Sequence, residues 1–119
     1  MGGAVTESSV QSGVFAAIAT AEALPGIARG TIHGAQMTVV RYVYQPGSVF
    51  PMHQHPQEQF TYIVSGRIVF TVDGIEQELG PGDFAIIPGD TPHGAQVNGD
   101  LVVETINIMS PRRDAPPTT

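Results

Sequence analysis

The stretch Gly66-Arg-Ile-Val-Phe-Thr-Val-Asp-Gly-Ile-Glu-Gln-Glu-Leu-Gly80 carries the clearest fold signal in this chain of 119 residues. A run rich in β-branched residues, Arg67–Val72, is separated from a second short run, Ile75–Leu79, only by Asp73-Gly74. A two-residue type I′ turn needs positive φ at both positions, which the Asp-Gly pair adopts readily. The stretch therefore predicts an antiparallel β-hairpin.

The same pattern of short runs and tight turns extends outward from this hairpin. From Gly34 onward, turns that contain Gly or Pro separate runs rich in Val, Ile, Phe, Tyr and Thr. We expect strands at Gln36–Gln45, Val49–Met52, Gln59–Val64, Arg67–Val72, Ile75–Leu79, Phe84–Ile87, His93–Val97 and Leu101–Ile108. About eight strands joined by short turns predict an all-β domain, a barrel of the jelly-roll type.

The region before Gly34 gives a weaker signal. Residues 14–24 fit a strand or a short helix, and the Ala-rich Ala19–Leu24 favours a helix that ends at Pro25-Gly26. His33 is expected in a surface turn.

The length of the chain suits a single domain. Residues 1–12 are small and polar, and the C-terminal residues contain three prolines. We predict a flexible N-terminus at 1–12, a barrel at 13–110 and a flexible tail at 111–119.

The composition excludes several kinds of chemistry and partner. All five basic residues are Arg, and the chain has no Lys or Cys, so Schiff-base lysines, thiolate nucleophiles and sulfur-ligated metals are ruled out. The net charge of −6 argues against a nucleic-acid partner. No apolar run reaches the ~18 residues that span a bilayer, and the N-terminus lacks a basic signal-peptide region, so we expect a cytoplasmic protein with no membrane partner.

Three of the four His residues form a pattern that suits a metal site. His53 and His55 are separated by one residue, so in a strand both side chains point to the same face. Gln59 shares the parity of His55, whereas Glu58 has the opposite parity. Together with His93, which follows a Pro, these residues predict one divalent metal ion held by His53, His55, Gln59 and His93.

The spacing around these residues resembles the two sequence motifs of the cupin superfamily, G-x5-H-x-H-x3-E-x6-G and G-x5-P-x-G-x2-H-x3-N. The first motif is matched by Gly47, His53, His55, Gln59 and Gly66, and the second by Gly82, Pro88 and His93. The resemblance implies a jelly-roll barrel with the metal inside its mouth, and often a dimer. Because only 13% of the residues are charged, which also favours self-association, we expect a homodimer.

Three positions depart from the cupin motifs: Gln59 replaces Glu, Asp90 replaces Gly, and Val97 replaces Asn. We expect the last two to be structural. A Gln ligand offers a neutral carbonyl oxygen, so three imidazoles and one amide leave a divalent ion with its full charge as a Lewis acid. The set lacks the carboxylate of ferrous oxygenases, which lowers the expectation of dioxygenation. Imidazole and amide ligands suit Zn, Ni, Fe, Mn or Co.

The segment His-x-His-Pro-x-Glu-Gln resembles small cupins that use the Gln as a ligand, among them cupins of pectin degradation that act on unsaturated uronates and cupins of natural-product pathways. Several of these carry Asp-x-Phe-Ser-Pro-x-Arg near the active-site mouth. The corresponding stretch here is Asn107-Ile-Met109-Ser-Pro-Arg-Arg113. The resemblance places Asn107, Met109 and Arg113 near the substrate. Because an Asn cannot shuttle protons as a carboxylate does, we expect a more apolar substrate than a sugar acid.

Other residues are candidates for a role at the site. Arg41 is expected either to bind a substrate carboxylate or to face solvent, and Glu104 to pair with an Arg. Tyr42 and Tyr44 share the opposite strand face, where they either belong to the core or offer a phenol to the cavity. The candidate catalytic residues are Tyr42, Tyr44 and Glu58.

These features predict a metal-dependent enzyme for a small molecule that stabilises an enolate by Lewis-acid chemistry. An isomerase, epimerase or tautomerase acting on an oxo-acid-like carbonyl substrate, with natural-product biosynthesis as one context, is the first hypothesis. A cupin-type polyketide cyclase or lyase comes second and a non-haem dioxygenase third. The non-enzymatic alternative is a metal-dependent binding or sensor module.

Overall fold

Ten short strands follow one another through the part of the chain that the computed structural model describes, residues 10–114. They are preceded by one turn of 3₁₀ helix, η1 (Phe15–Ala17). The strands are β1 (Ala21–Leu24), β2 (Ile27–His33), β3 (Thr38–Tyr44), β4 (Val49–His53), β5 (Glu58–Ser65), β6 (Ile68–Val72), β7 (Ile75–Leu79), β8 (Phe84–Ile87), β9 (His93–Gln96) and β10 (Val103–Ser110).

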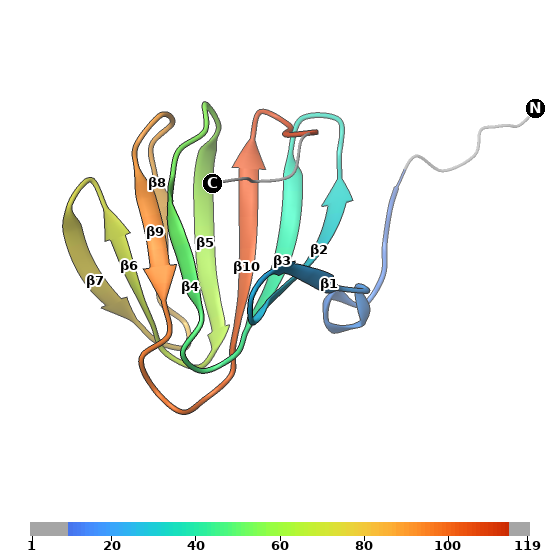
Figure 1. The fold of residues 1–119 in the computed structure, drawn as a ribbon. Helices are drawn as coiled ribbons and strands as arrows, with labels where there is room; N and C mark the ends of the chain where they lie inside the picture. The colour runs from blue at the N-terminus through green and yellow to red at the C-terminus, as the bar shows by residue number, and fades with distance from the viewer. Residues whose placement is uncertain (1–9, 115–119) are drawn as a thin grey trace, which may run out of the picture.

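The strands form two antiparallel sheets (Figure 1). The six-stranded sheet has the order β1-β2-β3-β10-β5-β8, and the four-stranded sheet has the order β4-β9-β6-β7. Successive residues of a strand face opposite sides, so each strand turns alternate residues into the space between the sheets. This arrangement confirms the prediction of an all-β jelly-roll barrel.

The predicted hairpin is confirmed. Strands β6 and β7 pair in register, with Val72 opposite Ile75, and the turn residues have φ of 51° at Asp73 and 80° at Gly74. These positive angles at both positions are those that a type I′ turn requires.

The expectation of a helix at Ala19–Leu24 is wrong. Residues Ala21–Leu24 form strand β1, which pairs with β2, and the turn between them contains Gly26 at a φ of 75°. The pairing with a neighbouring strand outweighs the weak helix preference of an Ala-rich segment. Strand β2 was not expected, and it ends at His33, which was expected in a turn.

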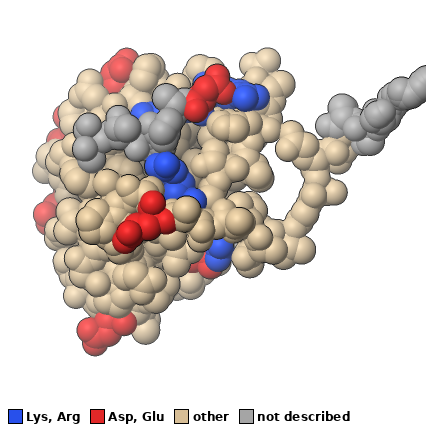
Figure 2. Space-filling view, turned by 45° about the vertical axis from the view of Figure 1, so that its right-hand side comes forward, with Lys and Arg blue, Asp and Glu red and all other residues tan. Residues whose placement is uncertain are grey.

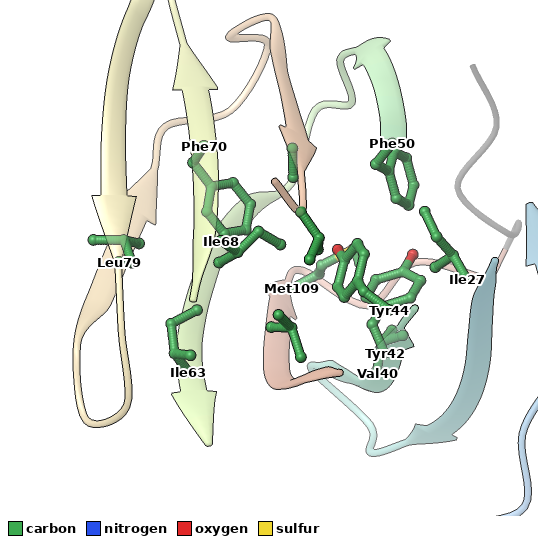
Figure 3. Close-up of a cluster of buried hydrophobic side chains, with 13 residues drawn as sticks. Ile27, Val40, Tyr42, Tyr44, Phe50, Ile63, Ile68, Phe70, Leu79 and Met109 are labelled. Atoms are coloured by element: carbon green, nitrogen blue, oxygen red, sulfur yellow. The ribbon is translucent and has the colours of Figure 1, made fainter. Parts of the chain in front are cut away.

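Alternation separates the inner and outer faces of the central strands. On β3, Thr38, Val40, Tyr42 and Tyr44 are buried, while the residues between them are only half-buried. On β10 the inward residues are Val103, Thr105, Asn107 and Met109. The close-up in Figure 3 shows Tyr42, Tyr44 and Met109 in the same cluster as Phe50, Phe70 and Ile63, which come from both sheets. The hydrophobic core and the inward polar groups therefore share one space.

The two structural departures from the cupin motifs fit their positions. Asp90 has a φ of 58°, in the left-handed region where Gly is favoured and where Asp is tolerated better than most residues. Val97 is buried in the core, and its backbone bonds to Ser48 and Gly47 at the end of the barrel.

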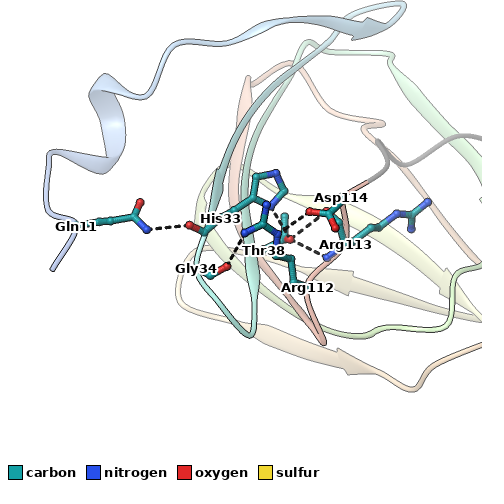
Figure 4. Close-up of polar contacts among 7 residues, drawn as sticks. All are labelled: Gln11, His33, Gly34, Thr38, Arg112, Arg113 and Asp114. Carbon is teal, nitrogen blue, oxygen red and sulfur yellow. Dashed lines mark hydrogen bonds and ion pairs between the residues drawn. The ribbon is translucent and has the colours of Figure 1, made fainter. Parts of the chain in front are cut away.

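The described residues after β10 return to the sheet. The backbone N–H of Arg113 donates to Thr38 Oγ1 at 2.8 Å, and that hydroxyl donates to the Arg113 carbonyl oxygen at 3.1 Å (Figure 4). At the other end, Gln11 donates to the carbonyl oxygen of His33. The flexible ends are predicted at residues 1–12 and 111–119. Of these, residues 1–9 and 115–119 lie outside the described residues, and the domain boundaries stay predictions.

The outer face of the six-stranded sheet carries apolar side chains beside its edge strand β8. Tyr62 and Val64 on β5 and Phe84 and Ile86 on β8 are exposed, and Tyr62 pairs with Phe84 across the strands. Figure 2 shows Arg and acidic side chains scattered over one largely uncharged side of the molecule. The homodimer stays a prediction. The described part of the chain has no helix with the length and hydropathy of a transmembrane span.

Candidate metal centre

Three imidazoles meet where β4 and β9 pair. His53 ends β4 and lies directly opposite His93, the first residue of β9. His55 follows two residues after His53. A side chain at Gly94 would collide with Met52 and with the Phe50 carbonyl, so Gly94 allows β9 to lie close to β4. One ring nitrogen from each of His53, His55 and His93 lies within 4.8 Å of the others, a spacing that one metal ion can bridge.

The second nitrogen of each ring fixes its orientation and its tautomer. Each Nδ1 lies 2.8–3.0 Å from a backbone carbonyl oxygen: His53 from Pro51, His55 from Gln57 and His93 from Thr91. A carbonyl oxygen can only accept, so each Nδ1 must carry the hydrogen and donate it. The Nε2 atoms are then left as acceptors, the arrangement found where a second interaction orients a metal-ligating His.

The Nε2 atom of His93 is the clearest sign that a cation belongs here. It is buried and has no hydrogen-bond partner among the described residues. Burial is the main cause that lowers the pKa of all three imidazoles, and it brings that of His93 to about 4. The three rings are therefore neutral near pH 7, the form in which imidazole binds a metal.

Gln59 adds a fourth acceptor to the cluster. Its Oε1 lies 3.0 Å from His55 Nε2, while its Nε2 donates to Thr61 Oγ1 at 2.9 Å and to Asn107 Oδ1 at 3.4 Å. The two donor contacts fix the amide with its oxygen toward the imidazoles. Two acceptors then face each other at 3.0 Å, which a shared cation would make favourable. Glu58 is exposed, whereas Gln59 is buried, as their opposite parity on β5 predicts.

Asn107 lies behind Gln59 rather than against the cavity. Its Nδ2 donates to the Val40 carbonyl and to Thr105 Oγ1, at 3.2 and 2.8 Å, and its Oδ1 accepts from Thr61 Oγ1 at 2.8 Å. The amide of Asn107 is thereby fixed, and through Thr61 it fixes that of Gln59. The geometry gives this residue, expected near the substrate, a role in orienting a ligand.

The four candidate ligands line a small cavity of about 20 Å³. The other side chains around it are mainly aromatic or apolar: Tyr42, Tyr44, Phe50, Phe70 and Met109. Such a volume suits one ion or one water molecule without movement of side chains. Among the described residues, no Asp or Glu lines it.

Tyr42 and Tyr44 belong both to the core and to the wall of this cavity. Burial raises the pKa of Tyr42 to about 12, although the neighbouring Arg29 and Arg113 act to lower it. Burial, and to a lesser extent Tyr42, raise the pKa of Tyr44 well above its ordinary value. Both phenols therefore keep their protons at neutral pH.

The arginines are divided between the two faces of the sheet. Arg41 points outward, where its Nε donates to Glu104 at 2.7 Å and its Nη1 to the Ile18 carbonyl. The expected pairing of Glu104 with an Arg is confirmed. The charge of Arg113 lowers the pKa of Tyr42 and of all three imidazoles.

Arg29 is a candidate site residue that the sequence did not predict. It lies on β2 directly opposite Tyr42 and hydrogen-bonds to the Tyr42 side chain. The alternation of Ile27, Arg29, Thr31 and His33 could have indicated an inward-facing arginine, but only if β2 had been recognised as a strand. His33 contacts Thr38 and is not part of the imidazole cluster.

The fold and this cluster define a β-barrel that can bind a metal ion through its inward His residues. A family model described as the cupin domain matches residues 40–109, more than half of the chain. The chain therefore belongs to the cupin family.

Several proteins are similar to this chain over different lengths. The dimethylsulfoniopropionate lyase DddQ of Ruegeria pomeroyi is 39% identical over 56 residues, which are 45% of this chain and 28% of that protein. An uncharacterized protein of Methanocaldococcus jannaschii is 28% identical over 66% of this chain and 63% of its own length. The chain thus spans less than two thirds of these two relatives.

Solved structures give longer matches. The structure of KdgF from a Halomonas species has a TM-score of 0.75 and 31% identity, covering 85% of this chain and 93% of that one. An RmlC-like cupin from Shewanella frigidimarina has a TM-score of 0.80 over 89% of this chain and 95% of its own, at 23% identity, which supports the fold alone.

The Thr61 contact leads to a prediction about metal affinity. Replacing Thr61 by Val removes an acceptor of the Gln59 amide with little change of shape, so we expect metal affinity to fall about 10–100-fold. Titration of the metal-free protein with Zn²⁺ measures this. Thr71→Val, the same change on β6 and outside the contacts among Gln59, Thr61 and Asn107, is the control. Equal affinities of the two variants would contradict the proposed role of Thr61.

The lowered pKa values predict how the stability of the metal-free protein depends on pH. Between about pH 6.5, the ordinary His value, and about pH 4, the unfolded chain takes up protons that folded His93 does not. The free energy of unfolding should therefore fall as the pH is lowered through this window. Urea denaturation at several pH values measures it.

Variants separate this effect from that of other titrating groups. His93→Gln should lose part of the pH dependence, whereas His33→Gln, which lies outside the imidazole cluster, should retain it. The same pH dependence in His93→Gln and in the unmodified protein would be evidence against the buried, neutral imidazole.

Proposed function

We propose that this protein is a metal-dependent enzyme that moves a proton next to a carbonyl group of a small, oxo-acid-like molecule, as an isomerase, epimerase or tautomerase does. The observation that carries the proposal is the neutral donor set, three imidazole nitrogens and one amide oxygen that converge in a buried cavity. A divalent ion held by His53, His55, Gln59 and His93 would keep its full charge and polarise a carbonyl oxygen.

Tyr42 is the cavity residue best suited to carry the proton. Its hydroxyl is protonated at neutral pH, since burial raises its pKa to about 12, and it can donate to a substrate atom. Arg29 and Arg113 lower that pKa against the effect of burial, which eases release of the proton. Glu58, the candidate carboxylate base, is exposed on the other face of β5, which argues for Tyr42 in its place.

A lyase reaction is the second candidate function. Elimination also begins with removal of a proton beside a carbonyl or carboxyl group, so the same residues could serve it. The similarity to the dimethylsulfoniopropionate lyase DddQ supports this candidate, although it covers 28% of that protein.

The small volume of the cavity favours a third role, metal-dependent binding or sensing without catalysis. A cavity of about 20 Å³ leaves little space for a substrate unless side chains at its rim move. This candidate predicts ligand binding without turnover, so one experiment separates it from the two enzymatic functions.

Removal of the metal should abolish proton exchange. We expect the metal-loaded protein to exchange the C3 protons of a 2-oxo acid with deuterium, and the chelator-treated protein to lose this activity. Proton NMR in D₂O measures the exchange, and reloading with Zn, Ni, Fe, Mn or Co in turn identifies the active ion. Exchange that persists in the metal-free protein, after correction for exchange in buffer, would refute the proposal.

Removal of the Tyr42 hydroxyl should slow exchange without loss of the metal. A positioned general acid or base contributes about 10²–10⁴-fold to a rate, so we expect a decrease in this range for Tyr42→Phe. Tyr62→Phe is the matched control, because Tyr62 lies on the outer face of β5. Metal content by elemental analysis should be the same in both variants. An unchanged exchange rate in Tyr42→Phe would exclude this residue as the proton carrier.

A further inference from the structure

The outer side of the six-stranded sheet carries a row of apolar side chains that crosses the strands from β2 to β8. Residues directly opposite each other on paired antiparallel strands point to the same side of a sheet. The strand registers place one residue of each strand in this row: Ile32, Val39, Ile108, Phe60 and Ile86. The row beside it consists of Gly30, Arg41, Ile106, Tyr62 and Phe84. We call these two rows together the outer apolar face.

This composition is unusual for the outer side of an antiparallel sheet, which is commonly polar where it meets water. Only Arg41 in the two rows is charged, and its Nε lies 2.7 Å from a carboxylate oxygen of Glu104. At the β8 edge Phe84 and Ile86 are 60% and 55% exposed, and Phe84 stacks on Phe60. The inner side of the same sheet already covers the hydrophobic core. A second apolar side therefore indicates contact with another molecule.

The opposite edge of this face contains a hollow. The segment before β1 crosses the outer side of β2 at Gly30, where a side chain would collide with Ile18 and Ala19. Figure 1 shows this segment beside β2, at the edge of the sheet away from β8. The hollow has a volume of about 440 Å³, and its apolar lining residues are Val14, Phe15, Ile18 and Ile32. A protruding apolar edge and an apolar hollow thus lie at the two ends of one face.

A two-fold axis parallel to β10 would bring these two ends together. Strand β10 is the middle strand between β2 and β8, so rotation about an axis along it places β8 of one copy over β2 of a second copy. Ile86 then faces Ile32 of the second copy, and Ile108 of each copy lies at the axis. The contact between edge and hollow occurs twice, as it must in a symmetric dimer.

The charge of the chain also favours a second copy on this face. Each chain has a net charge of −6, so two copies repel each other wherever their carboxylates meet. The two rows contain no Asp or Glu, and Glu104 beside them is paired with Arg41. The outer apolar face is therefore a surface on which two acidic molecules can approach closely.

The sheet is large enough for such a contact. Six strands spaced by about 4.8 Å give about 24 Å between the two edge strands, and the segment before β1 adds to this width. A standard interface buries about 800 Å² per partner, which is a patch about 28 Å on a side. The face with this segment thus offers an area of the order that a stable dimer needs.

We infer that two copies of this chain pack through the outer apolar face, with the β8 edge of each copy in the hollow beside β2 of the other. The two six-stranded sheets then lie face to face, about 10 Å apart, as the sheets of a β-sandwich do. The inference assigns a surface and a symmetry axis to the expected homodimer, and it does not depend on the proposed function.

Sedimentation equilibrium of the full chain tests the face. We expect a dimer with a dissociation constant below about 10 µM, and Ile86→Glu should raise this constant at least about 100-fold because it places a carboxylate in an apolar hollow. Ile75→Glu is the matched control, since Ile75 is 66% exposed and lies on β7 of the other sheet. Its dissociation constant should equal that of the unmodified protein.

Opposite charges at the two ends of the face test the axis. Ile32→Arg should weaken association on its own, because Ile32 faces Ile86 of the second copy. An equimolar mixture of Ile32→Arg and Ile86→Glu should associate at least about tenfold more tightly than either variant alone, since the introduced guanidinium group meets the introduced carboxylate. Thermal melting and titration with Zn²⁺ should show that every variant is folded and retains the imidazole site.

Three results would overturn the inference. The first is an unmodified protein that stays monomeric at about 100 µM, which would assign the face to a different partner. The second is an equal loss of association in Ile75→Glu and Ile86→Glu. The third is a mixture of Ile32→Arg and Ile86→Glu that associates no more tightly than the single variants, because β8 would then not face β2.

Discussion

Several ring nitrogens and an amide oxygen that carry no hydrogen point toward one place inside this barrel. Their closeness limits which groups can surround them. The backbone carbonyls of Pro51, Gln57 and Thr91 take the Nδ1 hydrogens, so the opposite ring atoms face one another as acceptors. A buried acceptor without a partner costs about 1–3 kcal/mol. The rigid strand pairing of β4 with β9 holds these atoms together, and a cation is the ligand that makes their proximity favourable.

The parity of each strand decides which polar groups share this environment. Arg29 and Arg41 lie on neighbouring strands and have the same chemistry, yet the first faces Tyr42 and the second faces Glu104 outside the barrel. Glu58 and Gln59 are separated in the same way on β5. As a result, neutral imidazole and amide groups line the cavity, and no acidic side chain of the described residues does.

Much of this could be predicted from the chain itself. The Asp73-Gly74 turn and the spacing of His53, His55 and His93 depend on local geometry, which sequence patterns report well. Strand β2 was missed because Gly30 interrupts its apolar pattern. The structure explains that glycine, since a side chain there would collide with Ile18 and Ala19, which cross the outer face of the strand.

The role of Asn107 could not be predicted for a different reason. Its contacts with Val40 and with Thr61 depend on the register of β10 against β3 and β5, and the residues paired in this way are far apart in sequence. The same holds for His53 and His93, which lie opposite each other although strands β5 to β8 lie between them in the sequence. Metal sites assembled from such distant residues rarely exist in the unfolded chain, where only His53 and His55 remain close together. Tight retention of an ion would therefore report that β4 and β9 have paired.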